Sequence, residues 1–352
     1  MNNRTVSKQR AGSRGRVGMD DKFSDERAQV IRRDWFLFLD EVEPFHSMLY
    51  SYCLKLTGSV WDAEDLLQDV LLKGYGMVAR GDFHGEHSPI SNLKAYLFRT
   101  TTNHWLDLQR RGRWMLPHWD EEQLVEAQGV DIRYVSAAME KALTVSSPQE
   151  FASILLKEVY GFSLLEIAEF IGTSEGTVKS ALNRVRAKVA KDASATSENG
   201  ARAAYSPVDP QVRVLAEAFV DAMNSGEVSE LKALMAKFVQ ITVCNVGGGR
   251  GRDGIWTEKS APGIVAEYGE YQGQGFVALY RMDTGEFHNV VTLQGAEGVV
   301  TRIMDYSYAK DTLERIAAEL GILAPRRGYH QPWDTIKNMV ATTALPWFKK
   351  SP

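Results

Sequence analysis

The chain has little cysteine, since Cys53 and Cys244 are its only two among 352 residues. Two thiols so far apart form neither the closely spaced ligand set of a metal site nor a disulfide framework. We therefore expect no metal and no disulfide. The pattern is typical of a protein kept in a reducing compartment, so we expect a cytoplasmic location.

Long apolar runs are also missing, although 44% of the residues are hydrophobic. No run approaches the roughly 18 residues that cross a bilayer, so we expect no membrane partner. The first 18 residues hold five basic residues and no apolar core segment, which argues against an export signal. We expect residues 1–22 to be a disordered basic tail.

An excess of positive charge is absent as well, because 41 Lys and Arg residues face 45 Asp and Glu residues. A net charge of −4 excludes general adhesion to nucleic acid, so any DNA binding has to come from local patches. A chain of this length is expected to form two or three domains with hydrophobic cores.

Two helical patterns lie back to back in "GFSLLEIAEFIGTSEGTVKSALNRVRAKV", residues 161–189. Ser163 and Glu166 form a capping box at the start of the first, and Gly172 ends it. Ser174 is placed to cap the second, whose apolar residues again recur every three or four positions. A further capped helix begins at Ser147, so three helices are predicted here.

The outer face of the second helix is polar and cationic. Lys and Arg neutralise phosphates and Asn, Ser and Thr pair with base edges, which favours a helix-turn-helix over a helical hairpin with a solvated charged face. The predicted DNA-binding residues are Ser174, Glu175, Thr177, Lys179, Ser180, Asn183, Arg184, Arg186 and Lys188.

Residues 45–113 have the periodicity of three further helices, which are expected to form one bundle. The second of these begins near Asp62 and is predicted to keep an acidic ridge outside, which suits a basic protein partner. The third begins near Leu93 and ends in a cationic rim, and Arg with Trp and His suits opened nucleic acid. The ridge comprises Asp62, Glu64, Asp65, Gln68 and Asp69, and the rim comprises Arg99, Asn103, His104, Arg110, Arg111 and Arg113.

Three stretches together resemble the conserved blocks of extracytoplasmic-function (ECF) sigma factors, in order and in separation. They are "LYSYCLKLTGSVWDAEDLLQDVLLKGY", "NLKAYLFRTTTNHWLDLQRRGRW" and residues 161–189 quoted above. The resemblance covers about residues 40–190 and implies an alternative sigma factor that directs promoter-specific transcription initiation and is not an enzyme. Its implied partners are promoter DNA and core RNA polymerase, which it would contact at the clamp of the largest subunit and at the upstream-side flap.

The resemblance also gives each patch a role. The acidic ridge falls on the polymerase-binding helix, and the cationic rim on the segment that contacts the melted promoter element. Residues 174–188 fall on the helix that reads the upstream element. Two departures are expected to lower the affinity for that element: Ala181 stands where members often carry Arg, and "SSPQEF" replaces a more basic entry into the three-helix unit.

A composition change after Val189 marks a linker, and a new domain follows it. Two amphipathic helices, the second running from Leu231 to Phe238, precede four strand-like runs in "VQITVCNV", "GFVALYRM", "EFHNVVTLQ" and "GVVTRIMDYSY". This α+β pattern, with an antiparallel sheet, is similar to SnoaL or ketosteroid-isomerase cones, which modulate the activity of some ECF sigma factors.

The expected fold class is therefore multidomain, with two all-α sigma-factor domains followed by an α+β cone. The expected boundaries are 1–22 for the tail, 23–113 for the polymerase-binding and promoter-melting domain, 114–136 for a linker, 137–191 for the helix-turn-helix domain, 192–209 for a second linker, 210–323 for the SnoaL-like regulatory domain, and 324–352 for a C-terminal extension.

Two rival functions remain open at this point. A cone can enclose an apolar pocket, so a small ligand is a candidate partner, and an isomerase-like or polyketide-cyclase-like enzyme is an alternative. No paired catalytic constellation emerges, and no cofactor is expected. The residues that could line such a pocket are Tyr280, Asp283, His288, Asp305 and Cys244. The other rival is a repressor that binds DNA without polymerase, as a dimer on a palindrome.

The stretch "GRGRDG" matches a dinucleotide fingerprint, but no helix pattern follows it, so a nucleotide site is not expected. We interpret residues 245–254 as a flexible loop between strands, in which Arg250 and Arg252 are candidates for a regulatory contact.

Overall fold

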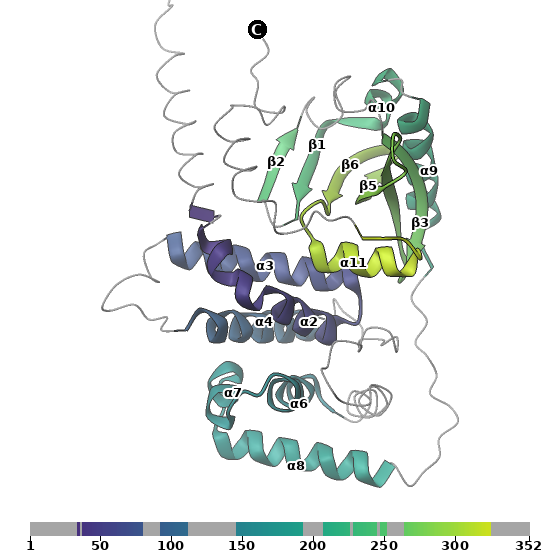
Figure 1. Cartoon of the computed structure of the whole chain (residues 1–352). Coiled ribbons are helices and arrows are strands. Elements are labelled where there is room, and N and C mark those ends of the chain that lie inside the picture. The colour runs from purple at the N-terminus through teal and green to yellow at the C-terminus, as the bar shows by residue number, and fades with distance from the viewer. Residues whose placement is uncertain are drawn as a thin grey trace, which may run out of the picture.

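The computed structural model describes residues 34–35, 37–79, 92–111, 146–192, 207–225, 228–244, 247–251 and 264–324. Figure 1 shows three layers, with a sheet-containing domain at one end, helices α2, α3 and α4 in the middle, and helices α6, α7 and α8 at the other end. The predictions for the basic tail, for Arg113 and Arg252, for linker 114–136 and for residues 325–352 lie outside the described residues.

The middle layer is built around α2, His46–Thr57, which a short 3₁₀ turn, Glu43–Phe45, precedes. Helices α3, Val60–Ala79, and α4, Leu93–Arg110, pack against it. Gly58 ends α2 with a φ of 73°, as its position in the pattern predicts. Almost the whole circumference of α2 is buried, because other elements cover it on several sides. Met48 is nevertheless exposed.

The three-helix unit consists of α6, Pro148–Ile154, extended by a π-helical turn Leu155–Val159, then α7, Leu164–Ile171, and α8, Glu175–Asp192. The capping boxes of α6 and α7 are both present. The amide of Thr177 donates to Ser174 Oγ at the start of α8. Gly172 adopts a φ of 72° at the turn between α7 and α8, which only glycine takes without strain.

An aromatic cluster joins this unit to the middle layer. Phe98 of α4 stacks on Tyr52 of α2, with ring centroids 5.1 Å apart, and also contacts Tyr160 and Phe162 of the three-helix unit. The Tyr160 hydroxyl donates to Ser51 Oγ at 3.3 Å. The two helical layers therefore share one hydrophobic core.

The first prediction concerns the cap of α7, which sets where the turn before α8 lies. Ser163 Oγ accepts from the amide of Glu166, and Glu166 Oε2 accepts from the amide of Ser163 at 2.8 Å. Ser163→Ala removes half of this box, so we expect the free energy of unfolding to fall by about 1 kcal/mol in urea denaturation. Ser180→Ala, on the exposed face of α8, is the control and should change it by less than about 0.5 kcal/mol.

The C-terminal domain begins with α9, Pro210–Ser225, and α10, Val228–Leu234. Six strands form one sheet in the order β2-β1-β6-β5-β4-β3, and α11, Lys310–Glu319, follows. The strands are β1 Met235–Val243, β2 Gly247–Gly251, β3 Ile264–Tyr271, β4 Gln274–Arg281, β5 Phe287–Ala296 and β6 Val299–Asp305.

Three predictions for this domain need correction, and one strand was missed. The helix expected from Leu231 to Phe238 ends at Leu234, where β1 begins. The glycine-rich stretch read as a loop holds strand β2, and Arg250 lies on it opposite Gln240. Strand β3 was not predicted. The sheet is mixed, because β1 pairs with β6 in parallel while its other strand pairs are antiparallel.

The two faces of this sheet have different neighbours. Helix α9 covers one face, where Phe219 and Met223 pack with Val291 and other apolar residues in a core of their own. The opposite face carries Phe276 and Tyr306, which belong to the core of the middle layer. Helix α11 lies beside α3 on this side (Figure 1).

Candidate functional sites

The acidic ridge of α3 does not lie on one surface. Asp65 and Asp69 are exposed, as predicted, and Asp62 is half-buried. Glu64 and Gln68, which were expected outside, are only 1% and 8% exposed. The prediction for these two side chains was wrong. At Glu64 the cause is Thr312 of α11, whose hydroxyl donates to Glu64 Oε2 at 2.9 Å.

The first turn of α3 also contacts the C-terminal domain. The indole Nε1–H of Trp61 donates to the carbonyl oxygen of Tyr271 at 2.9 Å, and the amide of Val60 donates to Gln272 Oε1 at 2.8 Å. The Trp61 ring lies 5.8 Å from that of Phe276 and 5.3 Å from that of Tyr306. The sheet therefore covers the N-terminal part of α3.

Electrostatics connect the exposed part of the ridge to the same domain. Burial of part of the Asp65 carboxyl, together with the neighbouring Asp62, raises the pKa of Asp65 to about 6, and the positive charge of Arg302 on β6 opposes this rise. A hydrogen bond from His104 lowers the pKa of Asp69. Asp65 is therefore influenced by Arg302 of the sheet, and Asp69 is bound by His104 of α4.

The residues of the cationic rim of α4 also differ in their surroundings. Arg99, Asn103, Arg110 and Arg111 are exposed. His104 instead bridges α3 and α4, since its Nε2 lies 2.9 Å from Asp69 Oδ2 and its Nδ1 lies 2.7 Å from Lys73 Nζ. Because an ammonium group only donates, Nδ1 accepts from Lys73 and Nε2–H donates to Asp69.

Helix α8 lies at the end of the molecule opposite the sheet (Figure 1). All nine predicted DNA-binding residues of this helix and its cap are exposed. Two of the cations have acidic partners. Arg184 donates from Nε and from its terminal nitrogen to Glu150 Oε1, at 3.1 and 3.0 Å, and Arg186 pairs with Glu158.

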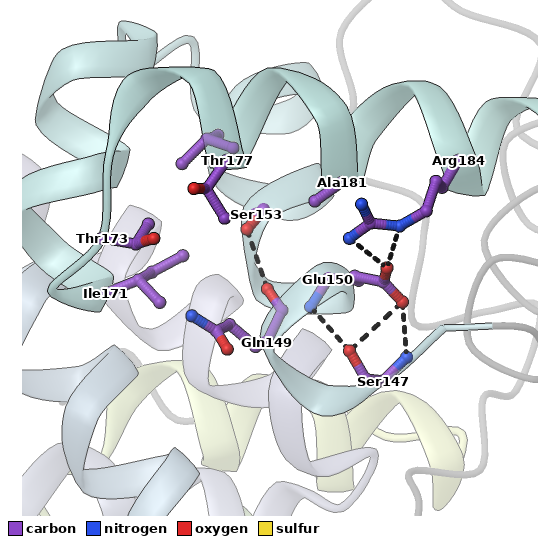
Figure 2. Close-up of a pocket in the computed structure, with 10 residues that line it drawn as sticks. Ser147, Gln149, Glu150, Ser153, Ile171, Thr173, Thr177, Ala181 and Arg184 are labelled. Carbon is purple, nitrogen blue, oxygen red and sulfur yellow. Dashed lines mark hydrogen bonds and ion pairs between the residues drawn. The ribbon is translucent and has the colours of Figure 1, made fainter.

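A cavity of about 100 Å³ lies between α6 and α8 next to the Glu150–Arg184 pair. Figure 2 shows Glu150 between Ser147, which it caps, and Arg184. Ala181 lines this cavity and is buried, so its small side chain bears on how α8 packs against α6. The effect of Ala181 on DNA affinity stays a prediction.

Family models match the two helical parts of the chain separately. Residues 42–115 match Sigma-70 region 2, and residues 147–189 match Sigma-70, region 4. The chain therefore contains two segments that match Sigma-70 regions 2 and 4, in that order. Helices α2, α3 and α4 thus belong to region 2, and α6, α7 and α8 belong to region 4.

The curated relatives to which the chain is similar are named ECF RNA polymerase sigma factors. The ECF RNA polymerase sigma factor SigG of Mycobacterium tuberculosis H37Rv is 28% identical over 226 residues, which cover 56% of this chain and 58% of SigG. The chain thus spans little more than half the length of that relative. SigW of Bacillus subtilis is 25% identical over 181 residues, covering 46% of this chain and 92% of SigW. The crystal structure of the M. tuberculosis ECF sigma factor SigJ is 18% identical, with a TM-score of 0.31, and covers 76% of this chain and 95% of SigJ.

The candidate pocket residues beyond region 4 do not form one catalytic group. Asp283 lies in the exposed turn after β4 and pairs with Arg281. Asp305 accepts hydrogen bonds from Asn289 and Ser307. Cys244 donates its amide to the carbonyl oxygen of Asp305, and burial raises the pKa of its thiol well above the usual value.

Tyr280 and His288 are half-buried on neighbouring strands, and burial raises the pKa of Tyr280. In the described ranges no three His, Cys, Asp or Glu side chains are grouped so that they could hold a metal ion. No helix among the described residues is long and apolar enough to span a membrane.

Several contact residues were missed from the sequence. Trp61 lies directly before the acidic ridge of region 2, and Gln272, Asp311 and Thr312 lie more than 200 positions later. A large aromatic residue next to an otherwise acidic face is a signal that could have pointed to a covered surface. Lys73, the partner of His104, gave no comparable signal.

Proposed function

We propose that this chain is an alternative sigma factor that binds core RNA polymerase and directs transcription from specific promoters. The observation that carries the proposal is the presence of both sigma-70 regions together with an outward-facing, polar and cationic α8. Asp65 and Asp69 are the exposed carboxylates of α3 that would meet the polymerase clamp. Such a factor works where polymerase and DNA are, in the cytoplasm.

Promoter contacts divide between the two regions in this proposal. The exposed side chains of α4, including Arg99 and Asn103, would contact the melted strand. On α8, Lys179, Ser180 and Asn183 would read the upstream element. Arg184 and Arg186 would exchange their carboxylate partners for phosphates, which costs little for ion pairs on a surface. The boundaries given above from the sequence are part of this proposal.

The C-terminal domain would regulate this activity, as SnoaL-like domains do in some sigma factors. Its two helices followed by a sheet and its contacts with α3 support that role. A small ligand and the candidate contact of Arg250 and Arg252 belong to the same proposal. The comparisons favour neither an enzyme nor a repressor that works without polymerase.

The second prediction tests this function by transcription in vitro. Purified chain and core polymerase are incubated with the promoter upstream of the chain's own gene. Asp65→Lys reverses one charge of the ridge, so we expect core binding and specific transcripts to fall at least about tenfold. Asp221→Lys, the same change at an exposed position of α9, should leave both unchanged. Failure of the unchanged protein to bind core polymerase would refute the proposal.

A further inference from the structure

The first helix of the three-helix unit and the turn that extends it carry two carboxylates that pair with cations of α8. Glu150 of α6 binds Arg184, and Glu158 of the π-helical turn pairs with Arg186. We infer that Glu150 sets the DNA affinity of this unit: it occupies Arg184 in the free chain, so that the chain alone binds duplex DNA of any sequence weakly. The inference rests on the proposed function in assigning α8 to DNA.

The Glu150 carboxylate is fixed in place by hydrogen bonds to both of its oxygens. Oε2 accepts from the amide and the hydroxyl of Ser147, at 3.1 and 3.2 Å, within the capping box of α6. Oε1 accepts from Arg184 Nε at 3.1 Å and from a terminal nitrogen of the same guanidinium at 3.0 Å. Figure 2 shows Glu150 between these two residues. Glu150 therefore cannot follow Arg184 toward DNA without breaking the cap of α6.

Glu150 also carries a full negative charge at neutral pH. Burial of the carboxyl raises its pKa, but the hydrogen bonds from Ser147 and Arg184 and the positive charge of Lys188 outweigh burial, so the pKa of Glu150 lies below its usual value. Lys188 lies one helical turn beyond Arg184 on α8. One carboxylate of α6 therefore compensates part of the charge of two cations on the predicted DNA-binding helix.

The two ion pairs differ in their exposure to water. The side chain of Glu150 is 13% exposed, whereas that of Glu158 is 48% exposed. Water and salt screen an exposed pair, so Arg186 leaves Glu158 at little cost. A carboxylate with less access to water attracts its partner more strongly, so Arg184 is held more firmly. Glu150 is therefore the main restraint on the cations of α8.

The restraint acts through the ions around the DNA. Each phosphate that a protein cation neutralises releases a counterion, and this release supplies most of the affinity that does not depend on sequence. When Arg184 moves to a phosphate, Glu150 loses its partner and takes up a cation from solution, which cancels the counterion released. Arg184 therefore adds little net affinity while Glu150 is charged. A chain with a net charge of −4 then stays off duplex DNA until polymerase brings α8 to it.

The third prediction tests this restraint in the full-length chain without polymerase. Glu150→Gln removes the charge but keeps a side chain that completes a capping box, so the Tm should shift by less than about 3 °C. Fluorescence anisotropy measures the affinity for a short duplex of unrelated sequence. We expect this affinity to rise about fivefold at ~0.1 M salt, and the plot of log K against log salt to steepen by about 1. The duplex upstream of the chain's own gene should gain by the same factor, because the change acts on phosphate contacts.

Matched variants separate the restraint from a general effect of charge. Glu169→Gln removes the same charge at an exposed position of α7 and should raise the affinity less than about twofold. In an Arg184→Gln background, Glu150→Gln should raise the affinity no more than Glu169→Gln does, because the ion pair is already absent. Glu158→Gln should steepen the salt dependence in the same direction but less. Its exposed pair caps no helix, so it still tests the restraint if Glu150→Gln unfolds the chain.

Three results would overturn the inference. Unchanged affinity and salt dependence after Glu150→Gln would show that Glu150 does not restrain Arg184. Lower affinity would show that Glu150 instead orients Arg184 for DNA. Absence of duplex binding by the unchanged chain and by Glu150→Gln at low salt would remove α8 as a DNA-binding helix. Titration of the unchanged chain with core polymerase decides the proposed function separately, so a failure there leaves the DNA measurements able to decide the restraint.

Discussion

Replacing Phe98 by alanine is expected to lower the free energy of unfolding by about 3–5 kcal/mol, because the change empties a fully buried aromatic site. Phe98 is 0% exposed and packs between Tyr52 of region 2 and Phe162 of region 4. The neighbouring Tyr160 ring lies 5.4 Å away. The substitution therefore creates a cavity between the two regions, and urea denaturation of the full-length chain measures the loss of stability.

Two other substitutions make this prediction specific. Phe98→Leu keeps most of the volume and should cost less than about 2 kcal/mol. Leu165→Ala removes an apolar side chain that is 59% exposed and should cost less than about 0.5 kcal/mol. If Phe98→Ala lies within about 1 kcal/mol of the unchanged chain, then the aromatic cluster does not hold the two regions together in solution.

Much of the helical part could be predicted because its signals are local. Apolar spacing located α3, α4 and α8, and the Ser163–Glu166 pair located the start of α7. These features depend on residues three or four positions apart, which a sequence displays directly. The exposure of Asp65 and Asp69 followed from the same periodicity.

The burial of Glu64 and Gln68 could not be predicted in this way. A single apolar stripe suggests a helix with one covered side, but α3 is also covered by α11 and by the β3–β4 hairpin. The partner of Glu64 lies 248 positions later in the chain. Periodicity carries no information about such a distant neighbour, and polar side chains that pair when buried look the same in sequence as solvated ones.

The arrangement of the sheet is a second feature that could not be predicted from the sequence. Strand β2 consists of four glycines and one arginine. It is extended because its backbone pairs with β1, since glycine has little intrinsic preference for strands. The parallel pairing of β1 with β6 joins residues 62 or more positions apart, such as Gln240 and Arg302. Strand patterns do not show which strands become neighbours or in which direction they run.

A chain that ends at Lys191 is expected to be less stable than the full-length chain and yet to bind core polymerase more tightly. Removing the C-terminal domain exposes Trp61 and Tyr50 to water, and each large side chain loses roughly 1.5–3 kcal/mol of burial. Rehydration of Glu64 offsets part of this loss. We expect a net loss of about 2 kcal/mol, seen as a lower Tm of region 2.

The predicted fall in stability and rise in polymerase affinity together identify the role of the domain. A domain that only supports the fold of region 2 would lower stability and polymerase binding together when removed. A domain that only blocks α3 would raise binding without changing the Tm. Thermal unfolding and core titration of the same samples separate these cases, and the full-length Thr312→Val chain is the comparison that keeps the domain in place. An unchanged Tm for the chain ending at Lys191 would show that Trp61 and Tyr50 are not held by the C-terminal domain in solution. A lower Tm with tighter binding would mean that the domain both supports region 2 and restrains it.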